Sequence, residues 1–216
     1  MTSLPTKVSN WDGMSDSPPA FASEAERLQV LQAIGLLDST PEPAYDDLAR
    51  LAAELWEAPI ALVCLVDEKR QWFKAACGME LRETPREHSF CAHNLESTEP
   101  LVVPDATLDP RFADNPFVRD GPRIRFYAGA PVGPAPGVTL GTLCVVDFKP
   151  RNPTAQQLER LRLLARQVSN EMRLRLAART EHSLRALESR LRQQAESLPF
   201  IVWTARTDGV VDYSNH

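Results

Sequence analysis

The sequence predicts an α+β protein built on an antiparallel sheet, and three observations lead to that fold class. Two segments between residues 23 and 56 carry apolar residues at helical spacing behind helix-start signals. At least four short segments between residues 59 and 147 are apolar or alternating, as strands are. A long helical pattern then begins at Thr154, which forms a further capping box with Gln157 three residues later. Because the strands are grouped between helices and several are joined by short turns, the order favours α+β architecture.

The two N-terminal helices are predicted from their start signals. Ser23 is followed three residues later by Glu26, the reciprocal capping pattern that satisfies exposed amides at a helix start. A second helix is expected to begin at Thr40 and Pro41, because proline at the first helical position leaves no amide unpaired. The expected buried stripes are Ala25, Leu28, Leu31 and Ile34 in the first helix, and Leu48, Leu51, Ala52 and Leu55 in the second.

The strands are predicted from short runs of branched and alternating residues. Residues 59–67, PIALVCLVD, indicate a buried central strand, and residues 70–78 are expected to form its hairpin partner. Residues 138–147 indicate another buried strand, and residues 123–132 alternate between two faces, with Ile124, Phe126, Ala128 and Ala130 on one and Arg125, Tyr127 and Gly129 on the other. Residues 79–122 show no long periodic stretch, and a connection of this length is usually functional or a lid.

The helical pattern from Thr154 to about Leu198 is too long for a helix packed only on one small domain. Its apolar residues step by threes and fours, as in the seam of a coiled coil. A run of four-residue steps through polar Thr180 resembles a stutter, which locally unwinds a supercoil. We expect a parallel homodimer along this helix, with folding back on the sheet as the alternative for its distal half. The predicted dimer residues are Leu158, Leu161, Ala165, Val168, Met172, Leu184, Leu187, Leu191 and Leu198.

Composition excludes several classes of protein. The chain of 216 residues is 43% hydrophobic and 25% charged, with a net charge of -5, which argues against a nucleic-acid partner bound mainly by electrostatics. Its longest apolar run, residues 59–66, is far shorter than the roughly 20 residues needed to cross a bilayer. Residues 1–22 are expected to be a disordered lead without a signal peptide. We therefore expect a cytoplasmic protein, and we expect this fragment of it to make no direct membrane contact.

The four cysteines fall into two pairs by their surroundings. Cys64 and Cys144 lie within apolar runs, where cysteine behaves as a small buried hydrophobe. Cys77 and Cys91 lie next to polar or glycine-containing segments and are expected to be the more accessible pair. A disulfide between Cys77 and Cys91 stays open at this point.

Six segments between residues 27 and 151 occur in order: RLQVLQAIGLLDSTPEPAYDDLARLAAEL, DEKRQWFKAACG, REHSFCAHNL, VVPDATLDPRFADNPFV, IRFYAGAPV and GTLCVVDFKPR. Together they resemble the GAF family of small-molecule sensor domains, in the branch found at the front of bacterial sensor histidine kinases and diguanylate cyclases. The resemblance implies a GAF domain over residues 23–175, with a six-stranded antiparallel sheet. It also implies helices on one face of that sheet and, on the other face, a pocket roofed by irregular connections.

The end of the chain has a different pattern. LPFIVWTARTDGVVDYSN alternates as strands do around an Asp-Gly turn, and it resembles the first strands of a PAS domain. Residues 176–198 would then be a signalling helix that continues the last GAF helix, and residues 199–216 would begin a truncated PAS domain. The resemblance implies that the full-length protein is a histidine kinase or a diguanylate cyclase, while this fragment is not itself an enzyme.

The segment REHSFCAHNL, residues 86–95, raises several chemical alternatives. On a helix His88 and Cys91 share a face while His93 points elsewhere, and no second ligand pair is evident, so we predict no metal site. A reactive thiol would need a base in reach and a lowered pKa, and His88 or His93 could provide that base. A methionine sulfoxide reductase-like GAF enzyme stays as an alternative. Bilin attachment is disfavoured because Ala92 separates Cys91 from His93, and the family's pattern for cyclic nucleotide binding is not found.

We expect this segment to form a wall of the pocket. The pocket candidates are Trp72, Phe90, Cys91, His93, Phe112, Arg125 and Tyr127. For Arg70, Arg86, Arg111 and Arg125, acidic residues nearby in sequence favour structural ion pairs over an anion clamp. No cofactor is firmly indicated. The expected function is sensory: an unknown small ligand or a redox change acts at the pocket, and a dimeric helix passes the signal to PAS and output domains. A ligand-free structural dimerisation module is the alternative of a different class.

Overall fold

The structure, a computed structural model, describes residues 21–196, 203–208 and 210–214. Residues 1–20 of the predicted lead, Leu198, and part of the predicted PAS segment lie outside the described residues. The helices in chain order are α1 (Glu24–Ile34), α2 (Pro43–Trp56), the short 3-10 helices η1 (Arg86–His88) and η2 (Cys91–Asn94), α3 (Pro116–Arg119) and α4 (Ala155–Glu196). The strands are β1 (Ile60–Val66), β2 (Arg70–Cys77), β3 (Glu83–Pro85), β4 (Leu101–Val103), β5 (Phe126–Val132), β6 (Gly141–Asp147), β7 (Trp203–Ala205) and β8 (Val211–Ser214).

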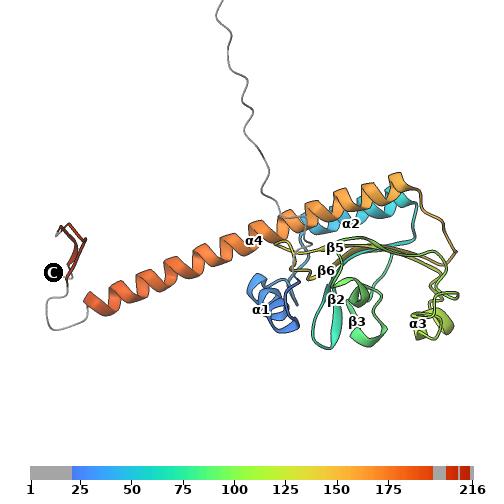
Figure 1. Ribbon diagram of the computed structural model, residues 1–216, viewed down its shortest axis with the longest axis horizontal. Helices are drawn as coiled ribbons and strands as arrows, with labels where there is room; N and C mark the ends of the chain where they lie inside the picture. The colour runs from blue at the N-terminus through green and yellow to red at the C-terminus, as the bar shows by residue number, and fades with distance from the viewer. Residues whose placement is uncertain (1–20, 197–202, 209, 215–216) are drawn as a thin grey trace, which may run out of the picture.

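The α+β fold is confirmed, with one six-stranded antiparallel sheet in the order β3-β2-β1-β6-β5-β4. The central strands β1 and β6 are buried on both faces, which explains their continuous apolar runs. α2 and α4 lie side by side over one face of the sheet, and irregular segments with η1, η2 and α3 cover the other (Figure 1). The molecule therefore has a helical layer, a sheet and an irregular layer.

The helix starts follow their predicted capping chemistry in two of three cases. The Ser23 hydroxyl accepts from the Glu26 amide while the Glu26 carboxylate accepts from Ser23, so the capping box is complete. Thr154 and Gln157 form the same reciprocal pair before α4. The second start is wrong by two residues, because α2 begins at Pro43.

The buried face of α2 also differs from the prediction. Leu51 and Leu55 are 44% and 42% exposed, whereas Tyr45, Ala49, Ala53 and Trp56 join Ala52 in the core. The reason is that small alanines let α2 lie close to the sheet, while Trp56 packs against Phe126 of β5 with 5.9 Å between ring centroids. The predicted set of residues and the observed set both fit helical spacing, so spacing alone could not identify the buried face.

The first half of α4 packs on its own sheet. Leu161, Ala165, Val168 and Met172 are almost completely buried in the core between the sheet and the helices, and Leu158 packs against that core. The prediction that these residues lie on a dimer face is therefore corrected: their apolar surface is already covered within the same chain. Three- and four-residue spacing describes both a coiled-coil seam and an amphipathic helix on a sheet.

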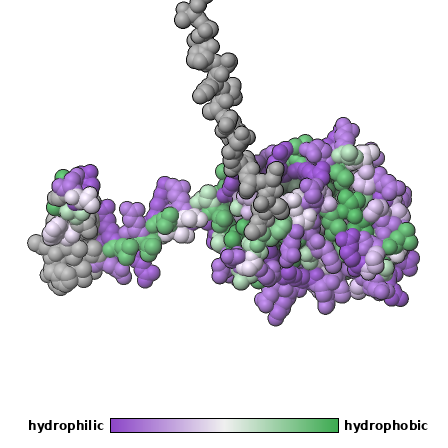
Figure 2. Space-filling view, viewed as in Figure 1, coloured by the Kyte–Doolittle hydropathy of each residue, from purple (hydrophilic) through white to green (hydrophobic). Residues whose placement is uncertain are grey.

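The second half of α4 extends away from the sheet (Figure 1). Leu184, Leu187 and Leu191 are 62%, 54% and 57% exposed there, and Figure 2 shows apolar surface between hydrophilic side chains along this part of the helix. At 3.6 residues per turn these leucines lie roughly a quarter turn away from the buried stripe. The distal half thus presents an apolar stripe of its own, and the alternative of folding back on the sheet does not occur.

A network of charged groups joins the sheet to α4 on the helical side. Lys74 of β2, in a bulge, has a fully buried side chain whose ammonium donates to the Ser39 hydroxyl, the Thr40 carbonyl and the Glu42 carboxylate at 2.6–2.8 Å. Arg175 of α4 pairs with the same Glu42 at 2.9 Å. In a separate contact, Arg175 and Arg179 donate to carbonyls at the end of α1, those of Ile34, Gly35 and Ala33.

The strands predicted near the end of the chain are present: β7 and β8 pair antiparallel, with Trp203 opposite Ser214. In the described part of the chain, no helix is long and apolar enough to cross a membrane.

Candidate functional site

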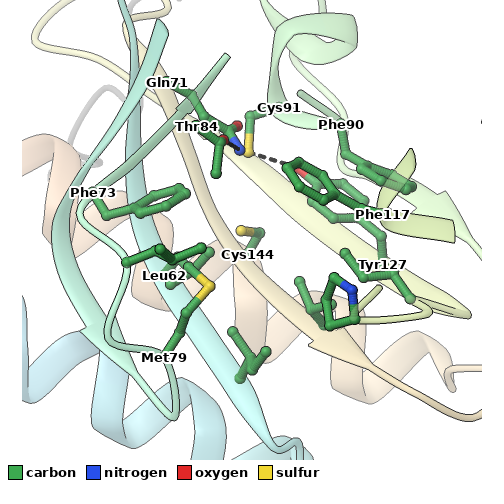
Figure 3. Close-up of a pocket in the computed structure, with 15 residues that line it drawn as sticks. Leu62, Gln71, Phe73, Met79, Thr84, Phe90, Cys91, Phe117, Tyr127 and Cys144 are labelled. Carbon is green, nitrogen blue, oxygen red and sulfur yellow. Dashed lines mark hydrogen bonds between the residues drawn. The ribbon is translucent and has the colours of Figure 1, made fainter. Parts of the chain in front are cut away.

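A cavity of about 70 Å³ lies between the sheet and its irregular cover. Its floor is the face of the sheet turned away from α2 and α4, and the floor residues are Ile60, Leu62, Phe73, Tyr127, Cys144 and Val146. Its cover comes from the chain between β2 and β5, through Met79, Leu81, Phe90, Phe117, Pro122 and Ile124. Figure 3 shows these side chains converging from both layers. The irregular connection predicted at residues 79–122 is therefore the roof of this cavity.

Two lining residues in the cover are exposed to solvent. They are Leu81, which follows β2 and is 56% exposed, and Pro122, which precedes β5, whereas most other lining residues are buried. A small molecule can therefore approach from solvent beside Leu81.

The walls are apolar except at one end. Gln71, Thr84 and Cys91 line the cavity with the Tyr127 hydroxyl, and no charged side chain stands among the described lining residues. The Gln71 amide donates to the Thr84 hydroxyl at 2.7 Å, and its carbonyl oxygen accepts from the Ser89 hydroxyl and, at 3.4 Å, from the Cys64 thiol. The polar groups are thus organised among themselves, as expected for polar atoms in an apolar enclosure.

Asn94 anchors η2 over the sheet. Its buried side-chain amide donates to the carbonyl of Gly129 on β5 at 3.0 Å. The Ser89 hydroxyl accepts from the Ala92 amide at 3.1 Å and so supports the same short helix. Together these bonds hold Cys91 against the floor.

Of the seven predicted pocket residues, Phe90, Cys91 and Tyr127 line the cavity. Cys91 faces the cavity and is only 3% exposed, which corrects the expectation that it is one of the accessible pair. Phe112 stands behind Phe90, with stacked rings 4.1 Å apart. Cys77 is partly buried, and all four cysteines are free, so the alternative of a Cys77–Cys91 disulfide does not apply.

The other three candidates lie elsewhere. Trp72 is on the opposite face of the sheet, in the core under the helices, so its assignment to the pocket is wrong. His93 packs edge-on against Phe112, 4.9 Å between centroids, and borders a shallow surface depression outside the cavity. Burial, followed by the neighbouring Arg111, lowers the pKa of His93. The Arg125 guanidinium donates to the Val118 carbonyl at 2.9 Å and holds the roof near α3.

The basic residues around the site are paired. Arg70 contacts Asp38, Asp67 and Glu83, and Arg111 contacts Asp109 at 2.6 Å. Arg86 of η1 pairs with Glu24 of α1. Arg70 and Arg111 therefore form the structural ion pairs that their acidic neighbours in sequence predicted. Arg86 is paired with a distant residue instead, and Arg125 donates to the backbone carbonyls of Val118 and Ile124. Among the described residues, no group of three His, Cys, Asp or Glu side chains is arranged to hold a metal ion.

Sequence reasoning missed Gln71, Met79, Leu81, Thr84, Phe117, Pro122 and Ile124 as lining residues. Alternation along β2 could have identified Gln71. Neighbouring side chains in a strand point to opposite faces, so Gln71 and Phe73 share one face of β2 and Trp72 lies on the other. The roof residues carry no periodic signal, and only the fold of the connection brings them together.

A family model of GAF domains matches residues 40–172 of the chain. The chain belongs to the GAF domain family. The cavity lies within the matched residues, between the GAF sheet and its roof.

The chain is also similar to known proteins, in sequence to one and in structure to two others. Over 141 residues, 65% of the chain, this GAF protein is 44% identical to a cyclic di-GMP phosphodiesterase of Pseudomonas aeruginosa, and it spans only 24% of that relative's length. Two solved GAF domains share the fold. One, from an Acinetobacter phosphoenolpyruvate-protein phosphotransferase, is 18% identical, with a TM-score of 0.52 and 71% and 96% of the two chains covered. The other, the blue-light absorbing form of the Thermosynechococcus elongatus PixJ GAF domain, is also 18% identical, with a TM-score of 0.53 and 76% and 98% covered.

Proposed function

We propose that this GAF domain is the sensor region of a bacterial signalling protein and that it binds a small, largely apolar molecule in the cavity. The observation that carries the proposal is the cavity itself, which is apolar, lies inside the domain and opens past Leu81. Similarity to a bacterial enzyme named for cyclic di-GMP hydrolysis supports a role in signalling. A filled core would have favoured a purely structural module instead.

The size and lining of the cavity limit the ligand. A cavity of about 70 Å³ is roughly half the volume of about 150 Å³ that accepts benzene in an engineered protein. Without movement of the roof it accepts only a few non-hydrogen atoms, and the lack of charged lining residues in the described chain matches a neutral ligand. A cyclic nucleotide or a bilin matches neither the size nor the uncharged walls.

The signal would reach α4 through the bulge in β2. Phe73 lines the cavity, and the next residue, Lys74, is bound to Glu42 on the helical side, which in turn pairs with Arg175 of α4. A ligand that shifts Phe73 would change the position of Lys74 and bias the helix where it leaves the domain. The mechanism is a shift between two populations of the helix.

The distal half of α4 would carry that bias as a parallel homodimer through Leu184, Leu187 and Leu191. The helix dimer would pass this bias to a PAS domain, whose first strands would be β7 and β8. From there it would reach an output domain of the histidine kinase or diguanylate cyclase type. The exposed leucine stripe supports this part of the proposal. We infer a cytoplasmic location for the assembly.

Ligand binding is tested by thermal denaturation of the whole chain with xenon, benzene and indole as probes and cyclic GMP as a polar control. The Leu62→Ala variant enlarges the cavity, and the matched Val63→Ala variant shortens the neighbouring residue on the opposite face of the same strand. We expect xenon to stabilise the unaltered protein, and benzene or indole to stabilise Leu62→Ala but not Val63→Ala. Absence of any probe effect in both the unaltered chain and Leu62→Ala would favour the ligand-free structural module.

Dimerisation is tested by light scattering on a size-exclusion column. Leu187→Asp and Leu191→Asp should each convert a dimer to a monomer. Leu174→Asp is the control, because Leu174 is equally exposed at 61% but lies off the distal stripe. A monomer in the unaltered chain at high concentration would contradict this part of the proposal.

A further inference from the structure

Three of the four cysteines, Cys64, Cys91 and Cys144, lie close together between η2 and the sheet. Cys64 and Cys144 lie on the adjacent strands β1 and β6, where Cys64 pairs with Thr142 and Cys144 pairs with Leu62. Their side chains therefore lie diagonally on one face of the sheet, the face that forms the cavity floor. Cys91 reaches the same place from η2, and Figure 3 shows the sulfur atoms of Cys91 and Cys144 in the same pocket.

The sulfur of Cys91 accepts a hydrogen bond from the Tyr127 hydroxyl at 3.5 Å. The neighbouring thiols, Cys144 first and then Cys64, lower the pKa of Cys91 well below its usual value. The interaction with Cys91, followed by burial, raises the pKa of Cys144. Cys91 is thus the member of the cluster that the surroundings favour as a thiolate, the nucleophilic form.

Cys144 is the partner best placed to react with Cys91. Both side chains line the cavity, so a small reagent that enters it meets both sulfur atoms. Cys64 lies deeper, with no exposed surface, and its single thiol proton is directed to the Gln71 oxygen at 3.4 Å. Cys77 packs on the helical side of the sheet.

We propose that Cys91 and Cys144 are a reactive thiol pair that a hydroperoxide oxidises to a disulfide within the cavity. The Cys91 thiolate attacks one peroxide oxygen, the O–O bond breaks, and Cys91 becomes a sulfenic acid as hydroxide leaves. The Cys144 thiol then attacks the Cys91 sulfur, an S–S bond forms, and the sulfenic oxygen leaves as water with the Cys144 proton. The peroxide is reduced by two electrons and the two thiols are oxidised. This chemistry goes beyond the proposed binding of an apolar ligand and does not depend on it.

The bridge would change the site in a defined way. It would join η2 of the roof to β6 of the floor and remove from Cys91 the charge that the Tyr127 hydroxyl contacts. Reversible disulfides of this kind in intracellular proteins are usually sensors or catalysts. The cavity would then report peroxide through the position of its roof.

The test is peptide mass spectrometry of the whole chain under non-reducing conditions, after treatment with hydrogen peroxide and blocking of the remaining thiols. We expect a linked peptide pair containing Cys91 and Cys144, reversed by dithiothreitol. The pair should be abolished in Cys91→Ala and Cys144→Ala and retained in Cys77→Ala and Cys64→Ala. Circular dichroism establishes whether each variant is folded. The linked peptide pair in the unaltered chain tests the proposal even if a variant does not fold.

Two outcomes would overturn the assignment. One is oxidation confined to Cys77 while Cys91 and Cys144 stay reduced. The other is a bridge from Cys91 to Cys64 or between two chains in place of the predicted pair. Because the readout is a covalent link, either result leaves the binding of xenon or benzene, and hence the proposed ligand site, to be judged separately.

Discussion

The two faces of the GAF sheet are built from the same strands but covered in different ways. On one face α2 and α4 bring long rows of apolar side chains at regular spacing, and the core there is closed around Leu143, Val145 and Leu161. On the other face the cover is a connection with only short helical turns, and a cavity remains above Leu62 and Cys144. Regular helices fill space efficiently, while an irregular cover leaves room for a ligand and for reactive groups.

The largest expected effect comes from truncating matched leucines on the two faces. Leu143→Ala, on the closed face, should lower the free energy of unfolding by about 4 kcal/mol, because it leaves a cavity in a packed core. Leu62→Ala borders an existing cavity and loses fewer contacts, so we expect about 3 kcal/mol. Urea denaturation measures both values. If Leu62→Ala cost as much as Leu143→Ala or more, the distinction between the two faces would be wrong.

The next effect concerns the charged network on the closed face. Glu42→Gln should cost about 2 kcal/mol, because it leaves the fully buried ammonium of Lys74 without its carboxylate. The value is below that of fully buried pairs because the Glu42 side chain is 33% exposed. The double variant Lys74→Met with Glu42→Gln should recover part of the loss. A double variant less stable than Glu42→Gln in urea denaturation would contradict this role.

On the cavity face, Gly129→Ala should act on Cys91 through Tyr127. A β-carbon at residue 129 would lie 2.1 Å from the Tyr127 hydroxyl, so that hydroxyl must move. We expect a loss of about 1–2 kcal/mol in stability and slower reaction of Cys91 with hydrogen peroxide, followed by mass spectrometry. Tyr127→Phe is the comparison, because it removes the hydroxyl without the added carbon and should slow the reaction as well. Unchanged reactivity of Cys91 with hydrogen peroxide in both variants would show that the Tyr127 hydroxyl has no role in the reaction of this thiol.

The smallest expected effect on stability concerns the carboxyl group of Glu24, which pairs with Arg27 of α1 and with Arg86 of η1. Arg27 and then Arg86 lower the pKa of this carboxyl to about 2, and Arg86 belongs to η1 on the cavity side. Because the folded pKa lies below the ordinary value, the contribution is present above about pH 4.5 and is lost as the pH falls towards 2. The carboxylate is half exposed, so it amounts to no more than about 1 kcal/mol. Glu24→Gln should therefore reduce the difference in stability between pH 5 and pH 3, measured by urea denaturation at the two pH values.

The amino-acid sequence by itself determined four of the sheet strands, the capping of α1 and α4, the hairpins and the irregular connection before β5. These features follow from local rules: alternation in strands, side-chain capping, and turn residues. The resemblance to GAF domains, rather than a local rule, implied that this connection roofs a pocket to which Phe90, Cys91 and Tyr127 belong.

Only the tertiary structure decided which face each residue occupies. A strand buried on both faces gives no sign of which face is covered by helices, so Trp72 was assigned to the wrong side. Leu161, Ala165, Val168 and Met172 fit a dimer seam as well as they fit the sheet on which they pack. The cluster of Cys64, Cys91 and Cys144 depends on the pairing of β1 with β6 and on the placement of η2 above them. Such contacts join residues far apart in the chain, and no local pattern in the sequence records them.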